Sequence, residues 1–206
     1  MDSLAPGESV GLGTSAEQLA TDIGLTESEV TWRKEFVGFT EEDAERLAAM
    51  RSVVDDNEEA FQDAFLEPIY AHDRTQEVLD RSPRGEEELR TIVTGYLRML
   101  TGGQYDREYF THRAQIGRLH DRLDMPLHYF GGMFANLHVV ILDALEELTK
   151  EAAVEAAEKG DIEGVEAAIE DGFANTAAAI RGTNLDMQVI NDTYLHSYSS
   201  DLRDEV

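Results

Sequence analysis

Apolar residues recur at helical spacing through most of this 206-residue chain, and no segment alternates apolar and polar residues as a half-buried strand does. Residues 87–100 are the clearest case, because their apolar side chains fall on one face of a helix. The pattern predicts an all-α protein. We expect helices over about 27–37, 40–53, 57–69, 75–79, 87–100, 107–123, 126–147, 152–159, 163–181 and 184–203.

Capping residues and helix breakers set these boundaries. Thr26 and Glu29 have the spacing of a capping box, and Thr40 and Asp106 are suited to cap two later helices. Pro68 should kink or bound its helix. Glycines and a proline near the amino terminus indicate a flexible lead-in, which we place at residues 1–19, followed by one domain over 20–206.

The chain carries 43 acidic and 17 basic residues, a net charge of −26. Such a surface repels nucleic acid and anionic lipid, so neither is expected as a partner. The acidic residues are dispersed over many helices. This distribution favours a protein hydrated in a salt-rich cytoplasm, and an acidic docking surface is the alternative.

The chain has no cysteine, which excludes disulfides, iron–sulfur clusters and thiolate-ligated haem. No apolar run approaches the roughly 20 residues of a membrane span, and the amino terminus lacks the pattern of a secretory signal. We therefore expect a cytoplasmic protein without membrane insertion.

The six histidines do not show the spacing of a dinuclear carboxylate site or of a zinc protease. His120 differs because it follows Ile116 and Leu119 near a helix end, just before Pro126. The next helix brings aromatic residues beside it. An imidazole in this position can be an axial ligand of haem iron. From spacing alone, an ordinary half-buried histidine is the other interpretation.

The segment from Ile116 to Leu123, followed by Tyr129, Phe130, Gly132 and Phe134, resembles the proximal region of sensor globins. The similarity is to the globin domains of haem-based aerotaxis transducers, within the globin-coupled sensor family. It extends over roughly residues 20–206 and includes Asp63-Ala64-Phe65 and the tract from Tyr105 to Tyr109.

This resemblance implies a globin fold with an extra amino-terminal helix, one haem b and His120 as its iron ligand. Tyr129 or Phe130 would lie beside His120, with core packing as the alternative role for both. The remaining residues of the implied haem site, Phe65, Leu66, Leu89, Ile92, Val93 and Met133, would make it apolar.

Leu66 departs from the family, in which many members have a tyrosine at this position that donates a hydrogen bond to oxygen. Losing such a donor costs on the order of 1–1.5 kcal/mol, roughly tenfold in affinity. Tyr70, Thr91, Thr94 and Tyr96 are candidate replacements.

The last helix carries an apolar stripe with two interpretations: burial within the monomer, or a homodimer formed through the last two long helices, as the family uses. Its members are Val189, Ile190, Tyr194, Tyr198 and Leu202, preceded by Ala177 and Ile180. Trp32, in the extra amino-terminal helix, is expected to anchor packing and not to contact haem.

We therefore predict a sensor of oxygen or another diatomic gas that is not itself an enzyme. As in aerotaxis, it would transmit its ligand state to a signalling module attached covalently outside this sequence. A stand-alone haem globin with nitric oxide or peroxide chemistry is the main alternative, and a haemless regulatory bundle is a third.

Overall fold

The computed structural model describes residues 15–204, and every regular element in that range is a helix. The prediction of an all-α protein is therefore confirmed for these residues. The predicted lead-in lies mostly outside them, but its last residues begin a short helix capped by Ser15. The helices are α1 (Ala16–Asp22), α2 (Glu27–Val37), α3 (Glu41–Ala49), α4 (Arg51–Asp56), α5 (Glu58–Tyr70), α6 (Asp73–Leu79), α7 (Glu86–Leu100), α8 (Arg107–Arg122), α9 (Leu127–Glu158) and α10 (Ile162–Asp204).

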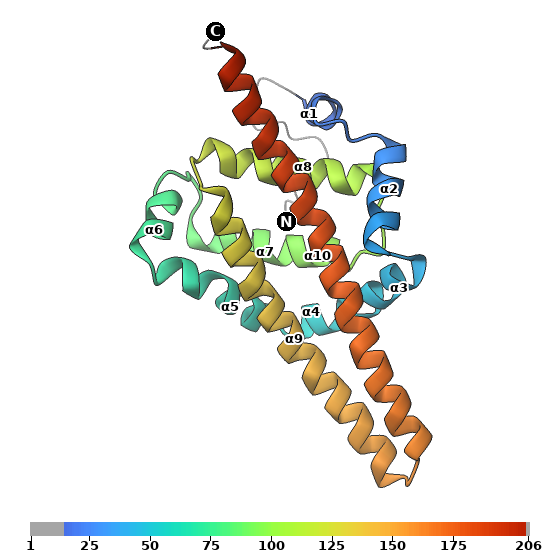
Figure 1. The fold of residues 1–206 in the computed structure, drawn as a ribbon. Coiled ribbons are helices and arrows are strands. Elements are labelled where there is room, and N and C mark those ends of the chain that lie inside the picture. The colour runs from blue at the N-terminus through green and yellow to red at the C-terminus, as the bar shows by residue number, and fades with distance from the viewer. Residues whose placement is uncertain (1–14, 205–206) are drawn as a thin grey trace.

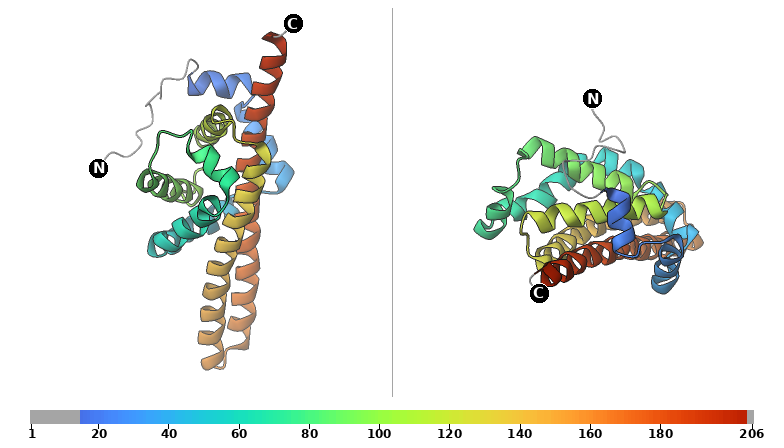
Figure 2. Two further views of the ribbon diagram at one scale, coloured as in Figure 1. Left: turned by 90° about the vertical axis from the view of Figure 1, so that its left-hand side faces the viewer. Right: turned by 90° about the horizontal axis from the view of Figure 1, so that it is seen from above.

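The two last helices form a long antiparallel hairpin that extends beyond the rest of the molecule (Figure 1). Helices α5, α6 and α7 lie together on one side of this hairpin (Figure 2). Helix α5 packs against α7 and α9, whereas α8 packs against α10 and α1. None of the described helices combines the length and apolarity needed to cross a membrane.

Helices α9 and α10 are longer than the sequence pattern predicted. The expected breaks near residues 147–152 and 181–184 do not exist, so both predictions were wrong. Gly182 explains the second error. It lies buried within α10, where an added Cβ would come within 3.1 Å of Leu47, so this glycine permits close packing and does not end a helix.

The helix starts follow the capping residues, with one difference. Thr40 and Asp43 form a complete capping box at α3, in which each side chain accepts from the other residue's backbone. Thr26 accepts from the amide of Glu29 at α2, but the Glu29 carboxylate pairs with Arg33 instead of returning the bond. The predicted capping box at α2 is therefore only half formed.

The apolar stripe of α10 divides between the core and the surface. Val189 and Ile190 are fully buried within this single chain, whereas Ile180 and Tyr198 are exposed. The side chain of Leu202 lies outside the described residues. Because Val189 and Ile190 are already covered, these two residues belong to the monomer core and are excluded from any dimer face.

Trp32 is not the packing anchor that the sequence suggested. Its side chain is 52% exposed and stacks on the still more exposed Phe36, with ring centroids 5.1 Å apart. The residues of α2 that face the protein are Val30 and Arg33. Arg33 forms an ion pair with Asp192 of α10, and this contact orients α2 while leaving the aromatic pair on the surface.

Candidate functional site

Helix α8 holds His120 at its carboxyl end. Asp106 caps the start of the helix by accepting from the amide of Tyr109 at 3.0 Å. At the other end, the amide of Met125 donates to the carbonyl of His120, and Asp124 adopts a left-handed conformation with φ of 49°. Aspartate tolerates this conformation better than most residues. The chain therefore reverses directly after His120, and α9 returns past its ring.

The imidazole of His120 is oriented by its own helix. Its Nδ1 lies 2.8 Å from the carbonyl oxygen of Ile116. A carbonyl oxygen can only accept, so Nδ1 carries the hydrogen. In the neutral ring the lone pair then belongs to Nε2, for which the described residues provide no hydrogen-bond partner. This arrangement fixes the tautomer and leaves the lone pair of Nε2 chemically able to coordinate a metal.

Burial lowers the pKa of His120, because the charged imidazolium loses hydration. The hydrogen bond to Ile116 opposes this effect, and the positive charge of Arg84 adds to it. The ring is therefore neutral at pH 7, which is the state that coordinates a metal.

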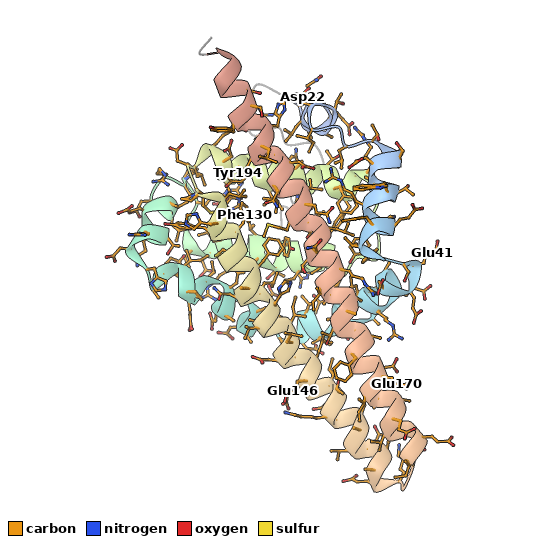
Figure 3. The ribbon with its side chains drawn as sticks, viewed as in Figure 1. Asp22, Glu41, Phe130, Glu146, Glu170 and Tyr194 are labelled. Atoms are coloured by element: carbon orange, nitrogen blue, oxygen red, sulfur yellow. The ribbon has the colours of Figure 1, made fainter. Side chains whose placement is uncertain are left out.

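The ring beside His120 belongs to Phe130. The two ring centroids are 4.8 Å apart, with the planes at 66°. Tyr129, the other residue that the sequence offered for this place, makes its ring contact with His128. Phe130 also meets the ring of Tyr194 from α10, with centroids 5.9 Å apart (Figure 3).

The other predicted contact residues come from three helices. Phe65 and Leu66 lie on α5, Met133 lies on α9, and α7 supplies Leu89, Ile92 and Val93. Leu66 and Val93 are buried, and the remaining four are half-buried. All six side chains are apolar, so they suit the faces of a planar hydrophobic group.

Most of the candidate donors opposite His120 have other partners. Thr94 donates to Glu58, and Thr91 donates to the carbonyl of Glu87. Tyr96 donates to Asp186 at 2.7 Å. The hydroxyl of Tyr70 forms no hydrogen bond within the described residues, and its side chain packs half-buried against the core.

Sequence reasoning missed a buried polar cluster formed by Arg113, Asp186, Tyr96 and Tyr109. Arg113 Nε lies 3.0 Å from Asp186 Oδ2, and both side chains are completely buried. The two tyrosines donate to Asp186, one to each carboxylate oxygen, and their rings flank the guanidinium at 4.2 and 4.4 Å. The only signal in the sequence was an arginine within a predicted helix, and such an arginine does not identify its partner.

The cluster keeps its charges because every partner supports them. Burial raises the pKa of Asp186, and the guanidinium and both hydroxyls act in the opposite direction. The two hydroxyls donate and the guanidinium is an opposite charge 3.0 Å away, so they stabilise the carboxylate form, although Arg113 Nε and Nη1 have no hydrogen-bond partner among the described residues. The cluster therefore joins α7, α8 and α10 at one point.

A groove of about 560 Å³ between α5 and α7 is lined mainly by carboxylates, which does not suit an apolar planar ligand. No group of three or more histidine, aspartate or glutamate side chains in residues 15–200 is arranged to hold a metal ion.

Comparisons with known proteins identify the family of proteins that this chain resembles. The Protoglobin family model matches residues 26–200. A heme-based aerotactic transducer, HemAT, of Halobacterium salinarum is 30% identical over 195 residues, which are 94% of this chain and 38% of the transducer. The chain thus spans well under half of that relative.

A solved structure supports the fold independently. The globin domain of a Geobacter sulfurreducens globin-coupled sensor superposes with a TM-score of 0.65 at 20% identity. The match covers 80% of this chain and 96% of that domain. The ten described helices therefore form a globin fold.

His112 gives a test of the electrostatics of α8. Its Nδ1 is buried without a partner among the described residues, and burial, with Arg113 nearby, lowers its pKa to about 4. The unfolded chain binds this proton near pH 6.5. The stabilising contribution of neutral His112 is therefore present above pH 6.5 and is lost as the pH falls toward 4. We predict that His112→Gln loses less unfolding free energy than the parent between pH 7 and pH 4.

Denaturant unfolding at a series of pH values measures this difference, with His72→Gln as the control because His72 is exposed. Equal acid sensitivity of His112→Gln and the parent protein would contradict the assignment.

Proposed function

This chain belongs to the protoglobin family, and on that premise we propose that it binds haem b through His120 and senses oxygen or another diatomic gas. The observation that carries the proposal is the orientation of His120, with Nδ1 donating to Ile116 and Nε2 left available. A bound haem would supply the iron at which a gas molecule binds reversibly. The protein itself would hold the axial imidazole and exclude water. It would also change its helix packing when the imidazole is displaced.

The following described residues are the ones that we propose as the lining of the haem site. His120 and Phe130 would lie on the proximal side, with Tyr129 nearby. The opposite and lateral walls would come from Phe65, Leu66, Leu89, Ile92, Val93 and Met133.

We propose binding and signalling, not catalysis, as the role of this domain. The similarity to an aerotactic transducer suggests that the ligand state is passed to a signalling output. Since the chain matches 38% of that transducer, such an output would be a further part of a longer protein. Binding would act by favouring one of two packings of the last two helices across a dimer interface.

Replacement of His120 tests its assignment as the axial ligand. We expect the wild-type protein supplied with haem to show an intense Soret band, and His120→Ala to lose the spectrum of ferrous haem ligated by histidine. His128→Ala is the matched control, because His128 is exposed and close in sequence. Absorption spectra of the ferrous proteins measure this. The proposal fails if the wild type binds no haem or if His120→Ala keeps its ferrous spectrum.

The second prediction concerns Leu66, which is 2% exposed and cannot donate a hydrogen bond. Leu66→Tyr should restore a donor and slow oxygen dissociation about tenfold, the equivalent of one hydrogen bond. Carbon monoxide, which is a weaker acceptor, should dissociate at a nearly unchanged rate. Stopped-flow kinetics measures both rates. An unchanged oxygen rate would show that position 66 does not face the gas.

We further propose that the protein forms a homodimer through α9 and α10. The support for this proposal is that both helices leave several large apolar side chains exposed to solvent. The exposed residues on α9 are Val139, Leu142, Leu148 and Val154, and those on α10 are Ile162, Ile169, Phe173, Ile180, Leu195 and Tyr198.

Phe173 tests this interface, since its side chain is 74% exposed. We predict that Phe173→Glu weakens self-association at least about tenfold, because the new charge would be placed in an apolar contact. Phe36→Glu is a control of similar exposure on α2. Sedimentation at high salt measures the association. A monomeric wild type, or a Phe173→Glu protein that dimerises normally, would contradict the proposed interface.

A further inference from the structure

Helix α10 contacts the surroundings of His120 through the side chain of Tyr194. Its ring meets Phe130 edge-on at a centroid distance of 5.9 Å, and Phe130 meets His120 at 4.8 Å (Figure 3). Three rings from three helices are therefore packed in series. Close-packed aromatic groups transmit displacement because they cannot be compressed into one another.

The hydroxyl of Tyr194 adds a second contact with the same region. It donates to the carbonyl of Met125 at 3.0 Å, in the turn that joins α8 to α9. Met125 is buried, and its own amide donates to the carbonyl of His120. Tyr194 thus contacts the neighbourhood of His120 both through its ring and through the backbone of this turn.

Gly117 holds α8 against the same segment of α10. An added Cβ at Gly117 would lie 3.2 Å from Ile190 Cα and 3.2 Å from Thr193 Cβ, so the two helices cross at backbone distance. This crossing is one turn before His120 and directly beside Tyr194. Helix α8 therefore has little freedom to move at this point without moving residues 190–194.

We propose that Tyr194 is the positioning residue that couples His120 to α10. A displacement of the imidazole moves Phe130 and the Met125 turn, and Tyr194 transfers both movements to the carboxyl-terminal part of α10. That part runs on to Asp204 and projects beyond the other helices (Figure 1). The proposal rests on haem binding by His120, since the displacement is the one that a gas ligand would cause.

The absence of cysteine from the chain permits a direct test. Ala60 on α5 and Ser199 on α10 are exposed and can be replaced by cysteine and spin-labelled. Pulsed electron paramagnetic resonance then measures the distance between the two labels in the ferrous protein with and without carbon monoxide. Dilution with unlabelled protein removes distances between protomers.

We expect carbon monoxide to change this distance in the parent protein and Tyr194→Leu to abolish most of the change. Tyr194→Phe, which keeps the ring, should retain more of it than Tyr194→Leu. The control is Phe36→Leu on α2, an aromatic residue outside the site and the proposed dimer interface, whose side chain is 71% exposed. Tyr194→Leu should also shift the iron–histidine stretching band in the resonance Raman spectrum, whereas Phe36→Leu should not.

The Soret band of each variant separates this proposal from the previous one. A parent protein that binds no haem would refute the assignment of His120 as the iron ligand. If all variants bind haem, an unchanged distance response and stretching band in Tyr194→Leu would overturn the role of Tyr194 alone. A parent protein whose distance does not respond to carbon monoxide would overturn it as well.

Discussion

The buried ion pair between Arg113 and Asp186 is the interaction on which the arrangement of the long helices depends. Its side chains are inaccessible to solvent, and two tyrosine hydroxyls complete the coordination of the carboxylate. Removing one partner of such a pair typically costs about 3–5 kcal/mol, because the other charge is left buried and uncompensated. The pair thus specifies one register of α8 against α10 and fixes α7 to both.

Helix α10 receives further polar contacts along its length. Arg181 pairs with Asp43 at the start of α3, and Asp192 pairs with Arg33 of α2. Asp43 also completes the capping box of α3, so one carboxylate both starts a helix and attaches it to α10. In a chain of net charge −26, these contacts place scarce basic residues where they join helices that are distant in the sequence.

Helix α8 connects the buried ion pair with the candidate site. Arg113 and His120 lie two helical turns apart on one side of α8, so the ion pair that anchors α8 also limits where His120 can be placed. Beyond the anchor, Gly117 and Tyr194 bring α10 close to the end of α8. In this arrangement His120, the proposed sensing residue, lies close to α10, the proposed output helix, and tightly packed residues fill the space between them.

Several features of this protein could be predicted from sequence because they depend on local chemistry. Helical periodicity and capping residues such as Thr40 and Asp106 act within a few residues, and they determined the all-α class and most helix starts. The sequence around His120 likewise indicated an imidazole at a helix end with an aromatic helix following. The match to globin-coupled sensors extended these local patterns along the chain.

The remaining features were decided by contacts between distant segments. Gly182 could be recognised as a packing residue only once Leu47 was opposite it, and Trp32 lies in solvent because Arg33 is the residue that turns toward α10. The choice of Phe130 as the neighbour of His120 depends on how the chain reverses after α8. A sequence shows that Arg113 and Asp186 exist, but burial alone makes their pairing necessary, and burial is a property of the folded chain.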